Sequence, residues 1–395
     1  MKIELHIIQN VAPSNLNRDD TGAPKDAEFG GYRRARLSSQ SMKRAMREQY
    51  VLPMNADLDH AVRTLQMVPA IDDALQAIRG TNSDDMAVRH QAIRAALSLV
   101  NIKVDAEKNT TQYLLFLPKR CAEHIAKLVH EHWDMLQSVE IGEGKKKGKS
   151  SDSATYKELI NALKAIMKDA SRTPEIALFG RMLADEPTWN VDAACQVAHA
   201  ISVNRVMSEF DFFTAVDDLK TDSTGAGMMG TVQFGSSTFY RYLVVDVDAY
   251  LANLAGHKPP YTTGLEEVAR ISLAAFIEAA VKSLPSGKQN TFAAHNLPSL
   301  VMTVVRADAP VSLANAFIKP VTATPEYNMA EAAIVKLDKH YGDITNAYGS
   351  DAIKAVHTLM VDVEVPELKH TQQHGVTTLR ELIDGTMHAC LGGAS

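Results

Sequence analysis

The sequence predicts an α+β fold. Its core consists of a strand and a helix followed by two strands, a helix and a strand, and it is interrupted twice. The chain opens with an alternating apolar pattern typical of a strand, at Lys2 to Val11. Residues 52–174 instead repeat apolar side chains at three- and four-residue intervals, which is typical of helices. Strand-like segments then return on either side of one long helical stretch. This order is that of a ferredoxin-like, or RNA-recognition-motif-like, core.

The first strand and first helix are predicted from the first fifty residues. Apolar side chains at positions 3, 5 and 7 alternate with Glu4 and His6, as in a strand with one buried face. After a long basic loop, Ser38 or Ser39 can cap a helix that runs to about Tyr50. Helical spacing places Met42, Ala45, Met46 and Gln49 on one face and Gln40, Lys43, Arg44 and Arg47 largely on the other.

The remaining core elements follow the helical insertion. Patterns predict strands at Ile176–Leu183, Thr238–Val247 and Ser299–Arg306, with a helix at Leu265–Leu284 between the last two. The C-terminal part is expected to add helices near Glu326–Tyr348 and Thr377–Cys390, with a strand-like segment between them at Leu359–Val365. No internal repeat is visible.

Length and composition fit a large intracellular protein. The chain has 395 residues, of which 46% are hydrophobic, enough for two or three packed units. No apolar run approaches the length of a membrane span and no signal peptide precedes the first strand, so a soluble, cytoplasmic protein is expected. Its 3 cysteines, Cys121, Cys195 and Cys390, lie far apart, which favours reduced thiols over disulfides or a metal site.

A basic segment near the N-terminus predicts an anionic partner. Between Arg33 and Arg47 there are 6 Lys or Arg residues and no acid, in a chain with a net charge of −6. The free N–H groups of the capped helix would form a phosphate site beside this charge. Phe29-Gly30-Gly31 permits a sharp turn close to a ligand, and Arg18 and Lys25 lie on the same connection. A solvated basic helix is the plainer alternative.

The second interruption of the core, residues 184–237, has little capacity to form a hydrophobic core of its own. Phe210, Phe212 and Phe213 precede a glycine-rich stretch, Thr221–Thr231. The pattern suits a projecting hairpin, and aromatic side chains at such a place could stack on nucleic-acid bases of any sequence. Buried core aromatics are the alternative, and for Phe212 the sequence leaves both open.

Three further patterns give weaker indications of function. Gly225-Ala226-Gly227-Met228-Met229-Gly230 matches G-x-G-x-x-G, but no apolar strand leads into it, so a dinucleotide site is not expected. His130 and His132 point to different faces of a helix and do not make a zinc pair. The run Gly144–Lys149 is expected to be a solvated loop, with contact to target DNA as the alternative.

Long strings in this chain resemble those of the CasC family, the guide-RNA-binding backbone subunit of the type I-E CRISPR surveillance complex called Cascade. They are NLNRDD, KDAEFGGYRRARLSSQSMKRAMR, ALFGRM, AHAIS followed by FFTAVDDL, GKQNTFAAHN and LANAF, in that order from Asn15 to Phe317. Long, irregular strings in order are more specific than short motifs. The resemblance is clear over residues 1–50 and 175–320, and elsewhere it extends mainly to helical character.

The resemblance implies a hand-like subunit. A discontinuous, RRM-like palm would comprise residues 1–51 and 175–325, with helical fingers at 53–174, a thumb within 184–237, and C-terminal helices at 326–395 completing the palm. It implies guide-backbone contacts at Arg18, Lys25, Ser38, Gln40, Lys43, Arg44, Arg47 and Lys288. Phe213 and Thr214 match the thumb tip, with Phe212 and Val216 beside it, and Met182 matches a palm residue next to a displaced base.

The implied partners are a guide crRNA, target DNA, further copies of this chain in a filament, and the other Cascade subunits: large, small, end-capping and crRNA-processing. No cofactor, metal or membrane is implied. Backbone subunits of related type III complexes cleave target RNA with an aspartate and a metal, so Asp26, with Asp19 and Asp20 upstream, makes a ribonuclease the alternative. A helical protein-interaction module with an incidental basic patch is the third reading.

Overall fold

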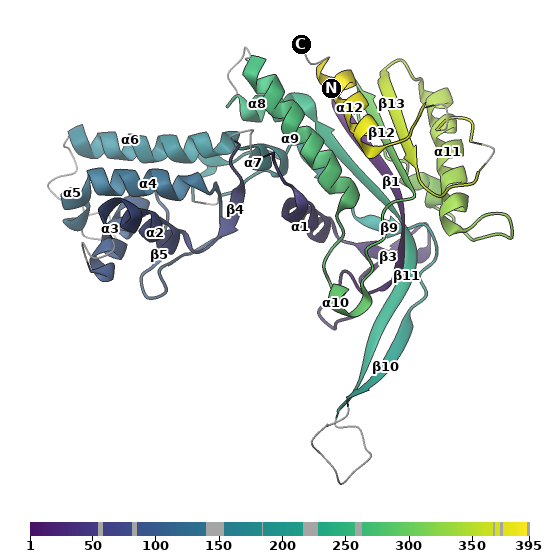
Figure 1. Ribbon diagram of the computed structural model, residues 1–395, viewed down its shortest axis with the longest axis horizontal. Coiled ribbons are helices and arrows are strands. Elements are labelled where there is room, and N and C mark those ends of the chain that lie inside the picture. Colours follow the sequence, from purple (N-terminus) through teal and green to yellow (C-terminus); the bar gives the residue numbers. More distant parts are fainter. Residues whose placement is uncertain are drawn as a thin grey trace, which may run out of the picture. The chain divides into compact units, whose positions relative to one another are not determined.

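The contacts of the chain divide it into two compact units. The palm unit comprises residues 1–51, 195–248 and 270–395, and the fingers unit comprises residues 52–194 and 249–269. The structure is a computed structural model, and it describes residues 1–53, 58–80, 85–139, 154–183, 185–215, 228–256, 263–365, 368–371 and 374–392. Its elements are shown in Figure 1.

The palm unit contains both strands and helices, and the fingers unit is mainly helical. The strands are β1 (Lys2–Ser14), β2 (Asp26–Phe29), β3 (Tyr32–Leu37), β4 (Ala61–Thr64), β5 (Val104–Asp105), β6 (Thr110–Thr111), β7 (Leu115–Pro118), β8 (Cys195–Val197), β9 (Ala200–Ser202), β10 (Glu209–Ala215), β11 (Met228–Asp246), β12 (Leu300–Arg306), β13 (Ile353–Met360) and β14 (Gly375–Val376). The helices are α1 (Ser39–Gln49), α2 (Met67–Arg79), α3 (Met86–Ser98), α4 (Arg120–Glu131), α5 (Trp133–Gln137), α6 (Ala154–Asp169), α7 (Pro174–Phe179), α8 (Val247–Leu254), α9 (Thr263–Lys282), α10 (Gln289–Phe292), α11 (Met329–Tyr348) and α12 (Leu379–Leu391), with a short 3-10 turn η4 at Ala314–Phe317.

The palm sheet has the topology that the sequence predicts. Its central strands are ordered β12-β1-β11-β9, and each neighbouring pair is antiparallel. Along the chain the core elements follow in the order β1, α1, β9, β11, α9 and β12. The two β-α-β units, β1-α1-β9 and β11-α9-β12, therefore interleave: β11 lies between β1 and β9, and β1 lies between β11 and β12. The α+β, ferredoxin-like core is therefore confirmed. The sheet then extends through β13 and β14 on one side and through β3 and β2 on the other.

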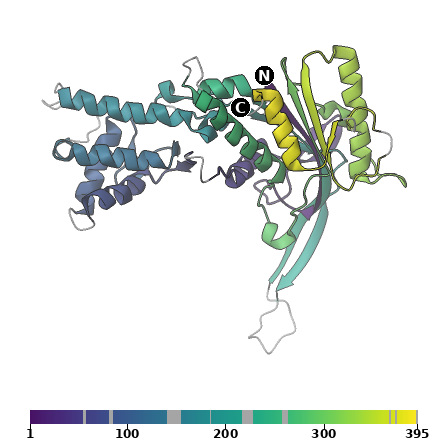
Figure 2. The same cartoon turned by 45° about the horizontal axis from the view of Figure 1, so that its top comes forward.

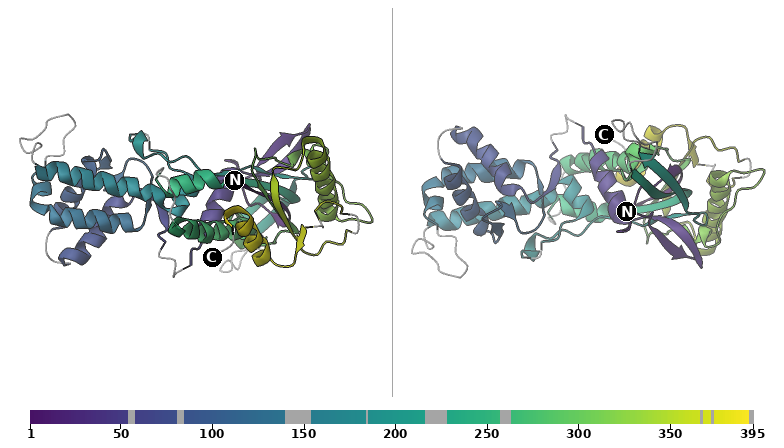
Figure 3. Two further views of the ribbon diagram at one scale, coloured as in Figure 1. Left: turned by 90° about the horizontal axis from the view of Figure 1, so that it is seen from above. Right: turned by 90° about the horizontal axis from the view of Figure 1, so that it is seen from below.

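Both faces of the sheet are covered, which the sequence did not indicate. On one face Arg241 donates to the carbonyl oxygens of α9, and Thr303 is hydrogen-bonded to Thr386 of α12 at 2.7 Å. On the other face α11 and η4 pack over Ile8 and Met302. The views along the sheet in Figure 3 show the strands between these two layers. Because helices cover both sides, β1 is buried along nearly its whole length.

Glu4 and His6 are consequently buried rather than exposed as the alternating pattern predicts. The Tyr242 hydroxyl donates to Glu4 Oε1 over 3.1 Å, and Arg306 Nη1 lies 3.5 Å from Glu4 Oε2. His6 Nδ1 and the Tyr240 hydroxyl are 2.9 Å apart. Burial raises the pKa of both tyrosines, so the hydroxyls keep their protons. These buried polar side chains therefore pair with one another inside the sheet.

Two segments predicted from the sequence differ in the structure. Ile176–Leu183 is predicted as a strand, but Pro174 begins helix α7 and Gly180, with φ at +75°, ends it. The following Arg181 is buried and donates to the carbonyl oxygens of Met167 and Trp189, both in the fingers unit. The palm therefore resumes at residue 195, not 175.

The strand predicted at Leu359–Val365 also lies earlier in the chain than expected. Strand β13 ends at Met360, whereas the pattern favours Leu359–Val365. Its register with β12 pairs Val304 with Val356, and this sheet pairing outweighs the local apolar pattern that follows. Helices α11 and α12 lie close to the predicted ranges, and both belong to the palm unit.

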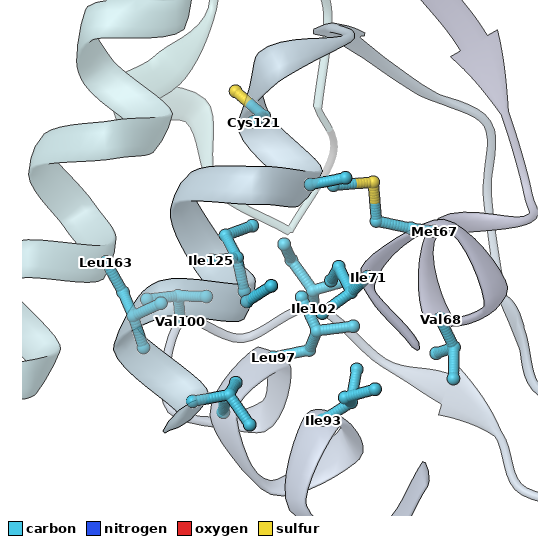
Figure 4. Close-up of a cluster of buried hydrophobic side chains, with 14 of the residues drawn as sticks. Met67, Val68, Ile71, Ile93, Leu97, Val100, Ile102, Cys121, Ile125 and Leu163 are labelled. Atoms are coloured by element: carbon cyan, nitrogen blue, oxygen red, sulfur yellow. The ribbon is translucent and has the colours of Figure 1, made fainter. Parts of the chain in front are cut away.

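The fingers unit has its own hydrophobic core. Figure 4 shows side chains from α2, α3, α4 and α6, among them Ile71, Ile93 and Ile125, converging on one another. Trp133 and Trp189, the only tryptophans of the chain, are both buried in this core. Tryptophan fluorescence therefore reports on the fingers unit alone.

A buried ion pair makes this unit sensitive to acid. Arg89 Nε and Nη2 donate to Asp72 at 2.6 and 3.2 Å, and Gln76 donates a third bond. Burial opposes ionisation, but these bonds outweigh it and lower the pKa of Asp72 below its usual value. A lowered pKa gives stability that is present above about pH 4 and is lost as pH falls through the folded-state pKa.

Tryptophan fluorescence is therefore expected to show loss of fingers stability towards urea as pH falls below about 4. The Asp72→Asn chain lacks the titrating carboxylate, so its stability should change less over the same range. Equal acid sensitivity in both chains would show that other carboxylates dominate.

Candidate nucleic-acid interface

Helix α1 begins as the sequence predicts. Ser38 is its N-cap, with extended backbone angles, and its side chain accepts a hydrogen bond from the Ser41 N–H at 3.3 Å. Met42, Ala45 and Met46 are buried, while Gln40 and Arg44 are exposed and Lys43 and Arg47 are half-buried. Gln49, predicted on the packed face, is exposed at the end of the helix. The polar face of α1 therefore carries the predicted basic residues.

The loop before β2 is tied to the start of α1 through Asn17. Its side-chain oxygen accepts from the Ser38 N–H at 2.8 Å, and its carbonyl accepts from the Lys25 N–H at 2.8 Å. Arg18 is the next residue, is exposed, and forms a β-bridge to Pro24. The hydrogen bonds of one asparagine thus bring Arg18, Lys25 and Ser38 together.

The GKQN segment, distant in sequence, packs against the same loop. A Cβ on Gly287 would lie 2.2 Å from the Leu16 carbonyl oxygen, so only glycine fits there. Lys288 follows with φ at +53°, and Arg18 and Gly287 line a common surface hollow. The structure therefore brings the backbone at Gly287 and Lys288 to the basic loop.

The β2–β3 hairpin carries mixed charge. Arg33 is ion-paired with Asp26 at 2.5 Å, and Arg36 Nε donates to the Asp26 carbonyl oxygen at 3.1 Å. Beside the pair lies an open, polar hollow of about 530 Å³, lined also by Arg205 and Gln233. The carboxylate of Asp26 is therefore already neutralised by a neighbour.

Arg34 does not belong to the basic surface. Its side chain is 0% exposed, and it donates to the carbonyl oxygens of Ser202, Val203, Phe317 and Ile318 at 2.7–3.1 Å. Burial lowers the pKa of this guanidinium. Although Arg34 counts among the 6 cations of the run, it ties the hairpin to β9 and η4 and is not available to a ligand.

The helix N-terminus is also less open than predicted. Ser39 N–H donates to His199 Nδ1 at 3.3 Å, and Ser41 N–H is taken by Ser38. Of the first three N–H groups of α1, only that of Gln40 has no partner among the described residues. Any ligand at this end must therefore rely mainly on side chains.

A two-stranded ribbon projects from the palm sheet beyond β9, as Figures 1 and 2 show. This thumb hairpin consists of β10 and residues 228–234 of β11. Glu209 pairs with Phe234, Phe213 with Gly230 and Thr214 with Met229. A Cβ on Gly230 would lie 2.4 Å from the ring of Phe213, so the ring lies over the glycine. At the base, the rings of Phe234 and Phe292 are 5.7 Å apart.

The register separates the two predicted tip residues. Successive residues of a strand face opposite sides, so Phe213 and Thr214 lie on different faces. Phe210, Phe212 and Met229 share the Thr214 face and are 68%, 63% and 67% exposed. The alternative that these phenylalanines are core residues is therefore wrong for Phe210 and Phe212. Val216 and the rest of the tip lie outside the described residues.

Met182 is the one predicted contact that falls in the fingers unit, where its side chain is 85% exposed. The Gly144–Lys149 run lies outside the described residues. Within the described ranges, no cluster of three or more His, Cys, Asp or Glu side chains could hold a metal ion. Nor does any described helix have the length and apolar character needed to cross a membrane.

His199, which accepts a hydrogen bond from the first N–H group of α1, was not predicted as a site residue. It lies in the AHAIS string, but a single histidine without metal-ligand or catalytic spacing gives no functional signal. Only the fold places it beside α1.

Comparisons with known proteins cover nearly the whole chain. It is similar to a chain of a solved "CRISPR RNA-guided surveillance complex, pre-nicking", with a TM-score of 0.79, 32% identity, and coverage of 98% of this chain and 100% of the other. A chain of a second "CRISPR RNA-guided surveillance complex" gives a TM-score of 0.70 and 27% identity over 99% and 100%. No curated protein matches. Residues 3–385 match the family described as CT1975-like protein, and the chain belongs to that family.

Proposed function

We propose that this chain is the non-catalytic, crRNA-binding backbone subunit of a cytoplasmic type I-E Cascade complex. Several copies assemble along one guide RNA, hold its backbone, displace bases periodically with the thumb hairpin, and present the guide for pairing with target DNA. The large, small, end-capping and crRNA-processing subunits are the other partners. In this arrangement base pairing reads the sequence and the protein reads the shape of the guide.

One observation carries the proposal: segments far apart in sequence bring cations to one surface next to an exposed aromatic ribbon. Arg18, Lys25, Lys43 and Lys288 come from the loop, α1 and the α10 turn of the same unit. A surface of this kind holds phosphates without reading bases. The exposed phenylalanines of the thumb hairpin can stack on any base, which suits guides of every sequence. The similarity to chains of two CRISPR RNA-guided surveillance complexes supports this role.

The cation surface predicts a specific salt dependence. Replacing Lys25 and Lys43 together by Ala should weaken binding of single-stranded RNA without sequence preference. Two lost phosphate contacts reduce the slope of log affinity against log salt by about 1.4. Fluorescence anisotropy of a labelled RNA over a series of KCl concentrations measures that slope. An unchanged slope in a folded variant argues against this surface.

The matched control removes two lysines from elsewhere on the palm unit. Lys339 on α11 and Lys354 on β13 are both exposed. The Lys339→Ala/Lys354→Ala chain has the same net charge as the test variant. Its slope should remain within error of the unchanged chain.

The ribonuclease alternative depends on Asp26, and the surroundings of that residue disfavour it. Its carboxylate is paired with Arg33 and its carbonyl with Arg36. A carboxylate neutralised by arginine is a poorer ligand for a divalent cation than a free one. We therefore expect no cleavage when the chain, with guide and complementary RNA, is incubated with Mg²⁺ or Mn²⁺. Cleavage that disappears in Asp26→Ala would establish the enzyme instead.

A further inference from the structure

His199 lies in the short connection between β8 and β9, and its side chain is exposed. Its Nδ1 lies 3.3 Å from the backbone nitrogen of Ser39, the first residue of α1. A backbone amide can only donate, so Nδ1 must accept, and in a neutral ring the proton is then on Nε2. The hydrogen-bond partner thus assigns the tautomer of the imidazole.

The ring stays neutral because of its surroundings. Partial burial lowers the pKa of His199, and the charges of Arg36 on β3 and Lys25 in the preceding loop lower it further. Both cations are among the groups that give the palm surface its positive charge. His199 therefore presents an Nε2–H donor beside cations that attract phosphate, while its other nitrogen is held by α1.

We propose that His199 is a phosphate contact of the bound RNA, donating through Nε2–H to a backbone oxygen. The proposal rests on the proposed function, since it assigns one more contact to the same surface. A neutral donor releases no counterion from the RNA. The contact consequently adds affinity without adding to the salt dependence, which distinguishes it from every lysine or arginine of the surface.

Two substitutions separate the contact from the link to α1. In His199→Asn the amide oxygen can accept from Ser39 as Nδ1 does, but no donor reaches the position of Nε2. In His199→Gln the longer side chain can place its amide N–H close to that position. His388→Asn, at an exposed position on α12, is the control for losing a histidine.

RNA affinity of the full chain would be measured at pH 7.5 by anisotropy of a labelled single-stranded RNA of mixed sequence, over a range of KCl concentrations. One lost hydrogen bond to a charged phosphate oxygen weakens binding about 12- to 150-fold. His199→Asn should show that loss at every salt concentration, with an unchanged slope. His199→Gln should recover most of the affinity, and His388→Asn should bind as the unchanged chain does. Thermal unfolding of each variant checks that α1 remains in place.

Each other outcome is informative. Equal affinity of His199→Asn and the unchanged chain overturns the contact. A slope reduced by about 0.7 would mean that the ring binds as a cation, which also overturns it. Equal losses in His199→Asn and His199→Gln would show that a donor near the Nε2 position does not restore binding, and would refute phosphate contact. If the unchanged chain shows no salt-dependent RNA binding, the proposed function fails, and not only the role of His199.

Discussion

Replacing residues 210–233 with Asn-Gly is expected to abolish cooperative loading of the chain on a long guide RNA. Glu209 and Phe234 are register partners, so a two-residue turn can close the shortened hairpin without disturbing its base. The shortened chain keeps α1, the basic loop and the α10 turn, and should bind one short RNA as before. What it loses is base stacking on the RNA of an adjacent copy, about 1–3 kcal/mol per base, or about 5- to 150-fold.

The hairpin projects beyond the rest of the palm sheet (Figure 1), which is why we expect it to act on a neighbour's RNA. Native mass spectrometry of mixtures of shortened and unchanged chains on a long guide gives the distribution of copies per RNA. Cooperative loading gives mostly empty and full RNA, whereas independent loading gives a binomial spread. Full-length assembly by the shortened chain with unchanged cooperativity would show that another surface couples the copies.

The two faces of the hairpin can be tested separately. Phe212→Ala alters the face shared with Thr214, and Phe213→Ala alters the opposite face, where the ring lies over Gly230. If bases stack on both faces, each variant should lose part of the cooperativity. If only one variant loses it, the register identifies the face that meets the RNA.

Replacing Arg34 by Met is expected to destabilise the palm unit by about 3–5 kcal/mol. The methionine fills part of the volume but leaves the carbonyl oxygens of Ser202, Val203, Phe317 and Ile318 without this donor. Urea unfolding followed by circular dichroism should show the loss. Tryptophan fluorescence, which reports on the fingers unit, serves as an internal reference.

Arg33 provides the matched control because it is the adjacent residue of the same type. Its side chain is 73% exposed and its pair with Asp26 is at the surface. Surface pairs contribute at most about 1 kcal/mol, so Arg33→Met should change stability little. RNA binding should also distinguish the two variants. Neither substitution removes a buried contact to a ligand, but only Arg34→Met loosens the β2–β3 hairpin. Equal stability of the two variants would contradict the anchoring role.

The sequence predicted the core well because its signals there are local. Ser38 is followed by a helix with Met42 and Met46 on one face, and a cap and a helical period suffice to predict α1. Strands β11 and β12 carry apolar, β-branched runs that match their burial. The short helix α7 was missed because an apolar run of this length fits a strand equally well, although Pro174 and Gly180 mark its ends.

The site was predicted less completely because its decisive contacts are between distant segments. Nothing in Arg33-Arg34 shows which arginine is buried, since the carbonyl groups that bind Arg34 lie more than 160 residues away. The alternation of a strand indicates only that the two face opposite sides. In the same way, the separation of Phe213 from Thr214 follows from the register of the hairpin, and the place of His199 follows from the packing of α1 against β8.

Strand β1 waits long for its partners. Lys2 pairs with a residue 244 positions later, and at the usual rate of translation that interval takes roughly ten to fifty seconds. Throughout it, the apolar side chains of β1 have neither β11 nor β12 beside them, although both faces of the strand are covered in the finished molecule. Residues 52–194, most of the fingers unit, are complete well before then. During synthesis β1 is thus an uncovered, aggregation-prone strand until the second half of the chain arrives.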